Sequence, residues 1–197
     1  MSDKDSSVIM QIPFDLTDTS DHIRMYRIKY KYTDFFRDHG YRSVQLNIDG
    51  HVSTYIGIVL NIDNRYYLVP LTSDKNNSLT DTWHQIVIPK SDTEKYGVAL
   101  FHNMIPVPLL ALELIDFEQL KKDDEDYFNV IFNEYQILNR PDMKQRCYAT
   151  ALEVYQASLG IKGGGGWLKS KLNTDIPRAI LLYEEFLLKL TSSEITL

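Results

Sequence analysis

The sequence predicts an α+β protein, because strand patterns fill its first half and helix patterns its second. Short runs of β-branched and aromatic residues, separated by turn residues, occur between residues 24 and 115. From residue 127 onward, apolar residues recur at helical spacing. The chain has 197 residues and is 44% hydrophobic, enough for one sizeable core, and the two patterns do not form self-sufficient halves. We therefore expect one domain over residues 25–197, preceded by an N-terminal extension over residues 1–24.

The first elements are a predicted strand and a short helix. Over residues 24–32, aromatic or aliphatic residues alternate with Met25 and mainly basic residues, a pattern typical of a strand. A short helix is predicted over residues 35–39, because Gly40 is a suitable residue to close it.

The strongest strand signal is a hairpin over residues 55–71. Both of its runs are rich in β-branched and aromatic residues, and Asp63 and Asn64 between them tolerate the positive φ of a two-residue turn. The chain then becomes polar at residues 72–78. Side chains at this strand end would meet solvent while a packed scaffold holds them, which is a favourable place for a functional site.

The remaining elements are short strands followed by long helices. Strands are predicted at residues 83–88, 97–101, 104–107 and 109–115, with prolines at their joints. Helices are predicted over residues 128–138, 147–158 and 176–190. Thr174 or Asp175 is expected to cap the last helix, and Pro177 fits its first turn.

The hairpin carries a family resemblance. Residues 55–75 have the form aromatic-Ile-Gly-Ile-Val-Leu, a short turn, then Tyr-Leu-x-Pro-Leu-Thr-Ser-x-Lys, which resembles the type III toxin–antitoxin endoribonucleases of the ToxN/AbiQ family. Met25-Tyr-Arg-Ile and Asn103-Met-Ile-Pro-Val look like two further strands of that family. The resemblance covers roughly residues 25–190. It implies a small SH3-like β-barrel of the Kid/MazF type decorated with helices, with a mainly helical C-terminal half.

The resemblance also implies a function. The implied protein is a metal-independent, sequence-selective endoribonuclease toxin. It uses the 2′-hydroxyl of RNA as nucleophile and leaves 2′,3′-cyclic phosphate ends. The implied partners are a repetitive pseudoknot RNA, which acts as antitoxin in a protein–RNA hetero-oligomer, and a cellular or phage RNA substrate. The implied role is phage defence by abortive infection, with no cofactor.

Three residues at the end of the hairpin are the expected catalytic group. The resemblance carries Thr72, Ser73 and Lys75 over to active-site positions, with the two hydroxyls orienting the scissile phosphate and the ammonium stabilising charge. Taken without the resemblance, Thr-Ser after a strand is more often a capped turn.

One departure from the family pattern concerns the positive charge near the site. The family commonly places a basic residue two positions before the aromatic that starts the hairpin, here Tyr55, but this chain has Ser53. Either His51, Arg42 or Arg65 supplies the charge instead, or the chain is a weaker catalyst than its relatives. We expect Arg42, His51, Ser53 and Tyr55 to contact RNA.

A glycine-rich segment supplies the other expected RNA contacts. Residues 163–166 are four consecutive glycines, which are costly in a helix, and Trp167, Lys169 and Lys171 follow. An aromatic ring among lysines suits RNA bases and phosphates. An ordinary connecting loop is an equal alternative.

Composition limits the other possibilities. No apolar run approaches the ~20 residues of a membrane span, and no signal-peptide pattern is present, so a cytoplasmic protein without membrane contact is expected. Cys147 is the only cysteine and is expected to be a buried helix residue, which excludes an internal disulfide. The acidic residues 123–126 lack histidine partners and precede a helix, so no metal site is predicted.

The net charge of −6 argues against indiscriminate binding to nucleic acid. Residues 1–24 carry −3 and residues 113–134 carry −6, so the rest of the chain is at +3. This distribution is compatible with one basic face that binds a particular RNA. Two alternatives remain open, namely a non-catalytic RNA-binding or protein-binding barrel, and a MazF-like toxin with a protein antitoxin.

Overall fold

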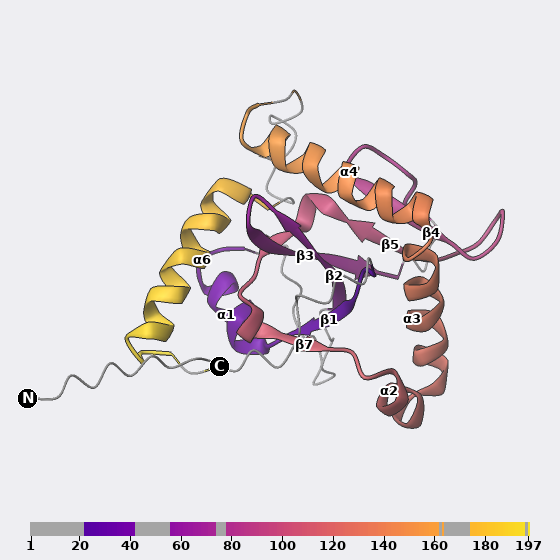
Figure 1. The fold of residues 1–197 in the computed structure, drawn as a ribbon, viewed down its shortest axis with the longest axis horizontal. Coiled ribbons are helices and arrows are strands. Elements are labelled where there is room, and N and C mark those ends of the chain that lie inside the picture. Colours follow the sequence, from indigo (N-terminus) through magenta and orange to yellow (C-terminus); the bar gives the residue numbers. More distant parts are fainter. Residues whose placement is uncertain (1–21, 42–55, 74–77, 162, 164–173, 196) are drawn as a thin grey trace, which may run out of the picture.

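The computed structural model describes residues 22–41, 56–73, 78–161, 163, 174–195 and 197, and these residues form the expected α+β fold (Figure 1). The strands are β1 Met25–Ile28, β2 Ile56–Ile62, β3 Arg65–Thr72, β4 Gln85–Pro89, β5 Lys95–Leu100, β6 Ile105–Pro106 and β7 Leu112–Leu114. The α-helices are α1 Tyr30–Asp38, α2 Phe117–Asp123, α3 Glu125–Leu138, α4 Pro141–Ser158 and α6 Ile176–Thr191. Two short 3₁₀ turns, η1 Phe101–Asn103 and η2 Leu109–Ala111, connect strands.

The strands form one antiparallel sheet in the order β4-β5-β3-β2-β1-β7, and β6 pairs with β3. Within the described residues, the two end strands β4 and β7 do not pair with each other, so the sheet is open. The expected SH3-like barrel of the Kid/MazF type is therefore not confirmed. The expectation of short strands followed by a mainly helical second half is confirmed.

The predicted hairpin is confirmed, and it sets the register at the centre of the sheet. Asp63 and Asn64 form its turn with φ values of 52° and 58°, in the left-handed region that such turns require. Strands β2 and β3 then pair from Ile62–Arg65 through to Gly57–Pro70. Because side chains alternate along each strand, this register decides which of them face each side of the sheet.

Helices cover both faces of the sheet, so it is the middle of three layers (Figure 1). One face packs against α3 and α4, whose buried side chains include Ile131, Cys147 and Val154. The opposite face packs against α1 and α6 through Tyr32, Phe36, Phe186 and their neighbours. We call these the α3/α4 face and the α1/α6 face. The prediction that Cys147 is a buried helix residue is confirmed.

The strand predicted over residues 24–32 is too long, because β1 ends at Ile28 and α1 begins at Tyr30. Aromatic side chains at residues 32, 35 and 36 also have helical spacing, and tertiary packing selects the helix. Tyr32 is fully buried and its hydroxyl donates to the Pro106 carbonyl at 2.6 Å. Gly40 closes the helix with a φ of 88°, as predicted.

Side-chain caps fix several helix starts. Asp175 caps α6 by accepting from the Arg178 amide at 3.2 Å, as one of the two predicted alternatives. Asp124 caps α3, so part of the acidic segment does lie at a helix start. Helix α2, capped by Asp116, was not predicted. Among the described helices, none is both long and apolar enough to cross a membrane.

Prediction for Gly57. A Cβ at this position would lie 2.3 Å from the Val69 carbonyl oxygen, which belongs to the paired backbone of β3 and cannot move alone. Gly57→Ala should therefore destabilise the protein by about 1–3 kcal/mol, measured by urea unfolding. Gly163→Ala is the control, because a Cβ there would meet no atom within 4 Å. Equal stabilities of the two variants would contradict the close approach of β2 and β3.

Candidate active site

The predicted catalytic hydroxyls lie where the central strand β3 ends. Thr72 is the last residue of β3 and is paired with Val98 of β5, while Ser73 follows it outside the sheet. Thr72 is half-buried and Ser73 is exposed. We call these two residues the β3 corner. Thr72 Oγ1 donates to the Ser73 carbonyl over a long 3.4 Å. Among the described residues, neither hydroxyl therefore makes a strong internal hydrogen bond.

Most of the predicted site residues lie outside the described residues. These are Lys75, Arg42, His51, Ser53, Tyr55, Trp167, Lys169 and Lys171. Their contribution to the site stays a prediction. The sheet does show where one of these segments is attached, because Gly57 is paired with Pro70. The described chain therefore resumes at Ile56 at the same end of the sheet at which β3 ends.

Arg65 does not fit the expectation that it supplies positive charge to the site. It begins β3, so the strand of eight residues separates it from Thr72 by about 23 Å. Its guanidinium donates to Glu184 Oε1 at 2.8 Å, and this hydrogen bond is the main reason why its pKa is raised. Arg65 therefore joins the hairpin to α6 and is not placed to supply charge at the β3 corner.

Glu134 of α3 is a functional candidate that the sequence reasoning missed. Its side chain is 3% exposed, and burial raises its pKa to about 8, so the carboxyl is largely protonated at neutral pH. Its Oε2 has no hydrogen-bond partner among the described residues. The spacing of Glu134 in the sequence could have revealed it. It lies three positions after Ile131 and four before Leu138, so this acidic residue shares the apolar, core-facing side of the helix.

A close contact brings Glu134 to the β3 corner. A Cβ built on Gly97 would lie 2.2 Å from Glu134 Oε1 and 2.9 Å from the Thr72 carbonyl oxygen. Both oxygens therefore lie against the Cα of Gly97, and only glycine leaves room for them. The glycine in β5 thus lets a buried carboxyl approach the backbone of a predicted catalytic residue.

Arg27 of β1 and Tyr127 of α3 lie near Glu134, and we call these three residues the Arg27–Tyr127–Glu134 group. Tyr127 has a raised pKa, caused first by burial and next by Glu134, while Arg27 acts in the opposite direction. The Arg27 Nε is buried and has no hydrogen-bond partner in the part of the chain that the structure describes. Buried polar side chains without hydrogen-bond partners are uncommon in a hydrophobic core. Next to a strand end that carries the half-buried Thr72 and the exposed Ser73, they are more typical of a reaction site.

Two histidines form a separate contact at the start of β4. The Nδ1 atoms of His84 and His102 lie 3.1 Å apart, and burial lowers the pKa of both rings, that of His102 to about 4. Both rings are therefore neutral at pH 7, and one Nδ1 must carry the hydrogen that the other accepts. Among the described residues, no group of three His, Cys, Asp or Glu side chains could hold a metal ion.

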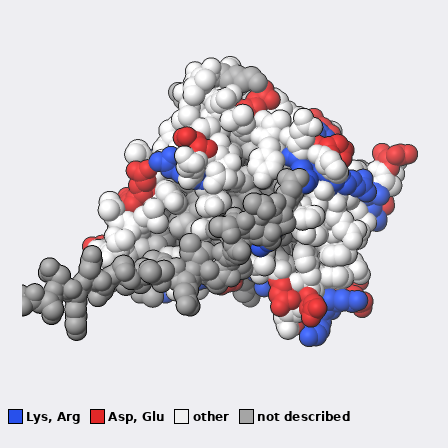
Figure 2. Space-filling view, viewed as in Figure 1, with Lys and Arg blue, Asp and Glu red and all other residues white. Residues whose placement is uncertain are grey.

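Surface charge does not mark an RNA-binding face by itself. On the face shown in Figure 2, basic and acidic side chains of the described residues lie interspersed. Several opposite charges of the described residues are also paired, such as Arg146 with Asp81 at 2.8 Å and Lys90 with Glu94 at 3.0 Å. The expectation of one basic face is thus not confirmed on this side of the molecule.

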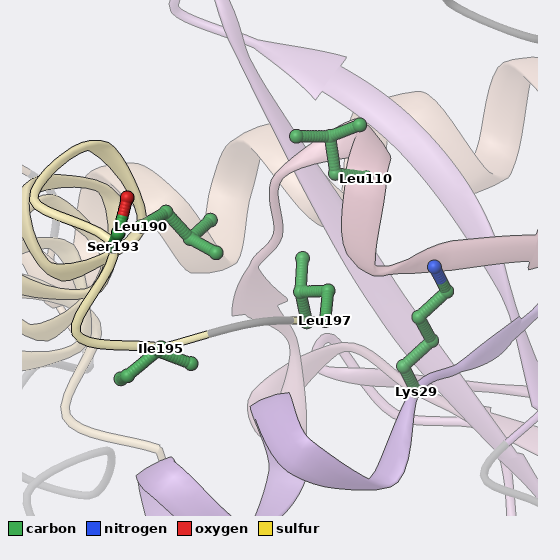
Figure 3. A pocket seen from close by; sticks show the side chains of 6 residues that line it. All are labelled: Lys29, Leu110, Leu190, Ser193, Ile195 and Leu197. Carbon is green, nitrogen blue, oxygen red and sulfur yellow. The ribbon is translucent and has the colours of Figure 1, made fainter.

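A cavity lies elsewhere, beside the end of α6. Its volume is about 360 Å³, and it is lined by Lys29, Leu110, Leu190, Ser193, Ile195 and Leu197. Figure 3 shows leucines from three segments gathered beside the Lys29 side chain. The lining is mainly aliphatic and includes no residue of the β3 corner or of the Arg27–Tyr127–Glu134 group, so this cavity is not the candidate active site.

Known proteins are similar to this chain in sequence. The chain matches the family of the toxin ToxN, type III toxin–antitoxin system, over residues 24–169. A curated relative, the endoribonuclease ToxN of Bacillus thuringiensis subsp. kurstaki, is 28% identical over 118 residues. That match covers 60% of this chain, and the chain spans 60% of the length of that relative.

Solved structures share the fold. One describes a bacterial type III toxin–antitoxin system whose toxin is selectively inhibited by a non-coding RNA pseudoknot. It aligns with a TM-score of 0.69 at 26% identity, covering 84% of this chain and 98% of that chain. Another is AbiQ, a lactococcal anti-phage endoribonuclease of a type III system, with a TM-score of 0.66 at 20% identity over the same shares.

The open sheet between helix layers is therefore that of type III toxin–antitoxin toxins. The chain belongs to the ToxN toxin family. The matched residues include the β3 corner, Arg27 and Glu134.

Prediction for Glu134. An unfolded glutamate loses its proton near pH 4.5, whereas burial keeps the folded Glu134 protonated to about pH 8. The folded state binds the extra proton, so stability should fall as pH rises from 5 to 8. Glu134→Gln removes this dependence, and by pH 8 it should be more stable than the unchanged protein by roughly 2–4 kcal/mol in urea unfolding. Glu125→Gln, in the exposed first turn of the same helix, is the control for charge removal. A stability difference that stays constant from pH 5 to 8 would mean that Glu134 is ionised in the folded protein.

Proposed function

We propose that this protein is an endoribonuclease and the toxin of a type III toxin–antitoxin system. The observation that carries the proposal is membership of the ToxN family over residues 24–169. The fold supports it, through a TM-score of 0.69 to a toxin inhibited by an RNA pseudoknot. The proposed unit is a single domain over residues 25–197 with an N-terminal extension, and its barrel-like character is part of the same proposal.

The proposed reaction is cleavage by the RNA's own 2′-hydroxyl. The 2′-oxygen attacks the adjacent phosphorus, the bond to the 5′-oxygen breaks, and the proton lost by the 2′-hydroxyl is matched by one gained at the leaving oxygen. The products carry a 2′,3′-cyclic phosphate and a 5′-hydroxyl. This step needs oriented donors around the phosphate and in-line positioning, with no hydrolytic water.

The β3 corner suits the donor role. Thr72 and Ser73 carry hydroxyls at the end of a strand that is paired on both sides, so their backbone is held while Ser73 stays exposed. We assign them to orienting the scissile phosphate and Lys75 to stabilising its charge. Arg42, His51, Ser53, Tyr55, Trp167, Lys169 and Lys171 are the proposed RNA contacts.

The proposed partners are two kinds of RNA. A repetitive pseudoknot RNA is the proposed antitoxin, bound in a protein–RNA assembly, and cellular or phage RNA is the proposed substrate. The biological role that follows is phage defence by abortive infection, in the cytoplasm. The structures described as a toxin inhibited by an RNA pseudoknot and as an anti-phage endoribonuclease support this choice over a protein antitoxin.

Prediction for Ser73. Loss of one donor to a phosphate in the transition state costs about 10²–10³ in rate in other enzymes, so Ser73→Ala should lower cleavage of total bacterial RNA by that factor. The same change should relieve growth arrest when the protein is expressed alone. Ser192→Ala, an exposed serine after α6, is the matched control and should cleave normally.

The outcomes separate the alternatives. Full cleavage by the Ser73→Ala variant would overturn the assigned site but leave the endoribonuclease function standing. A purified protein that binds repeat RNA and cleaves no RNA at any concentration would overturn the function itself, in favour of a non-catalytic binding module.

Prediction for metal dependence and products. Cleavage should be unaffected by excess EDTA, because the proposed step uses a substrate hydroxyl and protein donors only. Products should resist 3′-end labelling until the cyclic phosphate is opened and the resulting phosphate is removed by a phosphatase, which leaves a free 3′-hydroxyl. Inhibition by EDTA that is restored by one divalent cation would contradict this mechanism.

A further inference from the structure

We propose that Arg27 of β1 binds an RNA phosphate in the active site, with its guanidinium beside the β3 corner on the α3/α4 face of the sheet. This proposal rests on the proposed function and deepens it, because it names a further residue that touches the substrate. The ligand is a phosphodiester of single-stranded RNA.

The register of the sheet places Arg27 in line with the β3 corner. Arg27 is paired with Ile56, and one step beyond the Gly57–Pro70 pair, Ile56 comes beside Leu71. Arg27 is therefore two strands away from the residue just before Thr72, or about 10 Å between Cα atoms. An arginine side chain and a phosphate group together can span this distance.

The alternation of side chains places Arg27 and Ser73 on the same side of the sheet. In β1, Met25 packs into the α3/α4 core, whereas Tyr26 and Ile28 pack into the α1/α6 core, so Arg27 shares the face of Met25. In β3, the residues at 67, 69 and 71 pack into the α3/α4 core. Continuing this alternation gives Ser73 the same side.

Arg27 has no charge partner among the described residues. Its Nε is buried without a hydrogen bond, and its guanidinium makes no ion pair in that part of the chain. Leaving a buried charged donor unsatisfied is costly, so a ligand that completes it is favoured. A guanidinium fork matches the two free oxygens of a phosphodiester, and the Ser73 hydroxyl, on the same side of the sheet, can donate to the same group.

Nearby acidic and phenolic groups do not neutralise Arg27. Glu113 of β7 is its cross-strand neighbour but forms no ion pair with it. Tyr127 is a weak acid with a raised pKa. Burial alone accounts for the raised pKa of Glu134, so no cation of the described residues compensates that carboxyl. The neutral state of Glu134 leaves the positive charge of Arg27 available to an anion.

The position of Arg27 can also compensate for the absence of a basic residue at Ser53. The resemblance implies a basic residue there, and Arg65 is engaged at the far end of β3. Arg27 is paired with Ile56, the first residue of β2, so it reaches the same end of the sheet from the neighbouring strand. A cation on β1 can thus serve the phosphate that a cation before β2 would otherwise serve.

The test compares Arg27→Met, Arg27→Lys and Glu113→Gln with the unchanged protein. Arg27→Met should lower cleavage of total bacterial RNA by about 100-fold, while Arg27→Lys keeps part of the rate, because an ammonium retains charge but cannot bind in a bidentate manner. Glu113→Gln removes the nearest acidic residue on the same strand row and should cleave at least as well as the unchanged protein. Urea unfolding of each variant identifies any loss that comes from folding.

A second measurement does not depend on cleavage. Binding of a fluorescent, single-stranded 2′-O-methyl RNA is followed against salt concentration. Loss of one phosphate contact should reduce the slope of log affinity against log salt by about 0.7 in Arg27→Met. An unchanged salt slope, or full cleavage by Arg27→Met, would overturn the role of Arg27 while the endoribonuclease function stands. Absence of cleavage by the unchanged protein would instead count against the proposed function.

Discussion

The pairing of β2 with β3 is the constraint on which the rest of the structure depends. Asp63 and Asn64 adopt positive φ values, and the two strands then pair without a break up to Gly57 and Pro70. A shift of one residue would move every side chain of β3 to the other face. The register therefore fixes both the α3/α4 core and the place where the strand delivers Thr72. Gly57 is needed here because the Val69 carbonyl occupies the space of a Cβ.

The two faces of the sheet are built differently. The α1/α6 face is packed by aromatic rings, such as Tyr32 against Phe186 at 4.7 Å between centroids, and is apolar at its centre. The α3/α4 face is apolar at its centre but includes Arg27, Tyr127 and Glu134 toward the end of β3. Buried polar groups that lack partners reduce stability, so proteins tend to retain them where they serve function. The sheet thus separates a face that contributes stability from a face that can contribute chemistry.

Local signals were enough to predict the elements that depend on short-range chemistry. The turn at Asp63 and Asn64, the end of α1 at Gly40 and the cap at Asp175 each follow from the preference of a residue for one backbone conformation or one hydrogen bond. The boundary between β1 and α1 was wrong, because its aromatic residues satisfy both a strand and a helix pattern. Only tertiary packing, with Tyr32 buried against Pro106 and Phe186, decides between them.

The candidate site needs information that no local pattern contains. Thr72 and Ser73 were predicted from their resemblance to a family motif, whereas Glu134 lies far along the chain and reaches Thr72 only because Gly97 lies between them. Arg27 was assigned to a basic strand face, and its place beside Leu71 follows from two successive strand pairings. A chain with a net charge of −6 cannot rely on a broad positive field to hold RNA. A guanidinium that has no ion-pair partner among the described residues, held in a fixed register on the same side of the sheet as the Ser73 hydroxyl, favours one phosphate in one geometry, which is what the proposed selective nuclease requires.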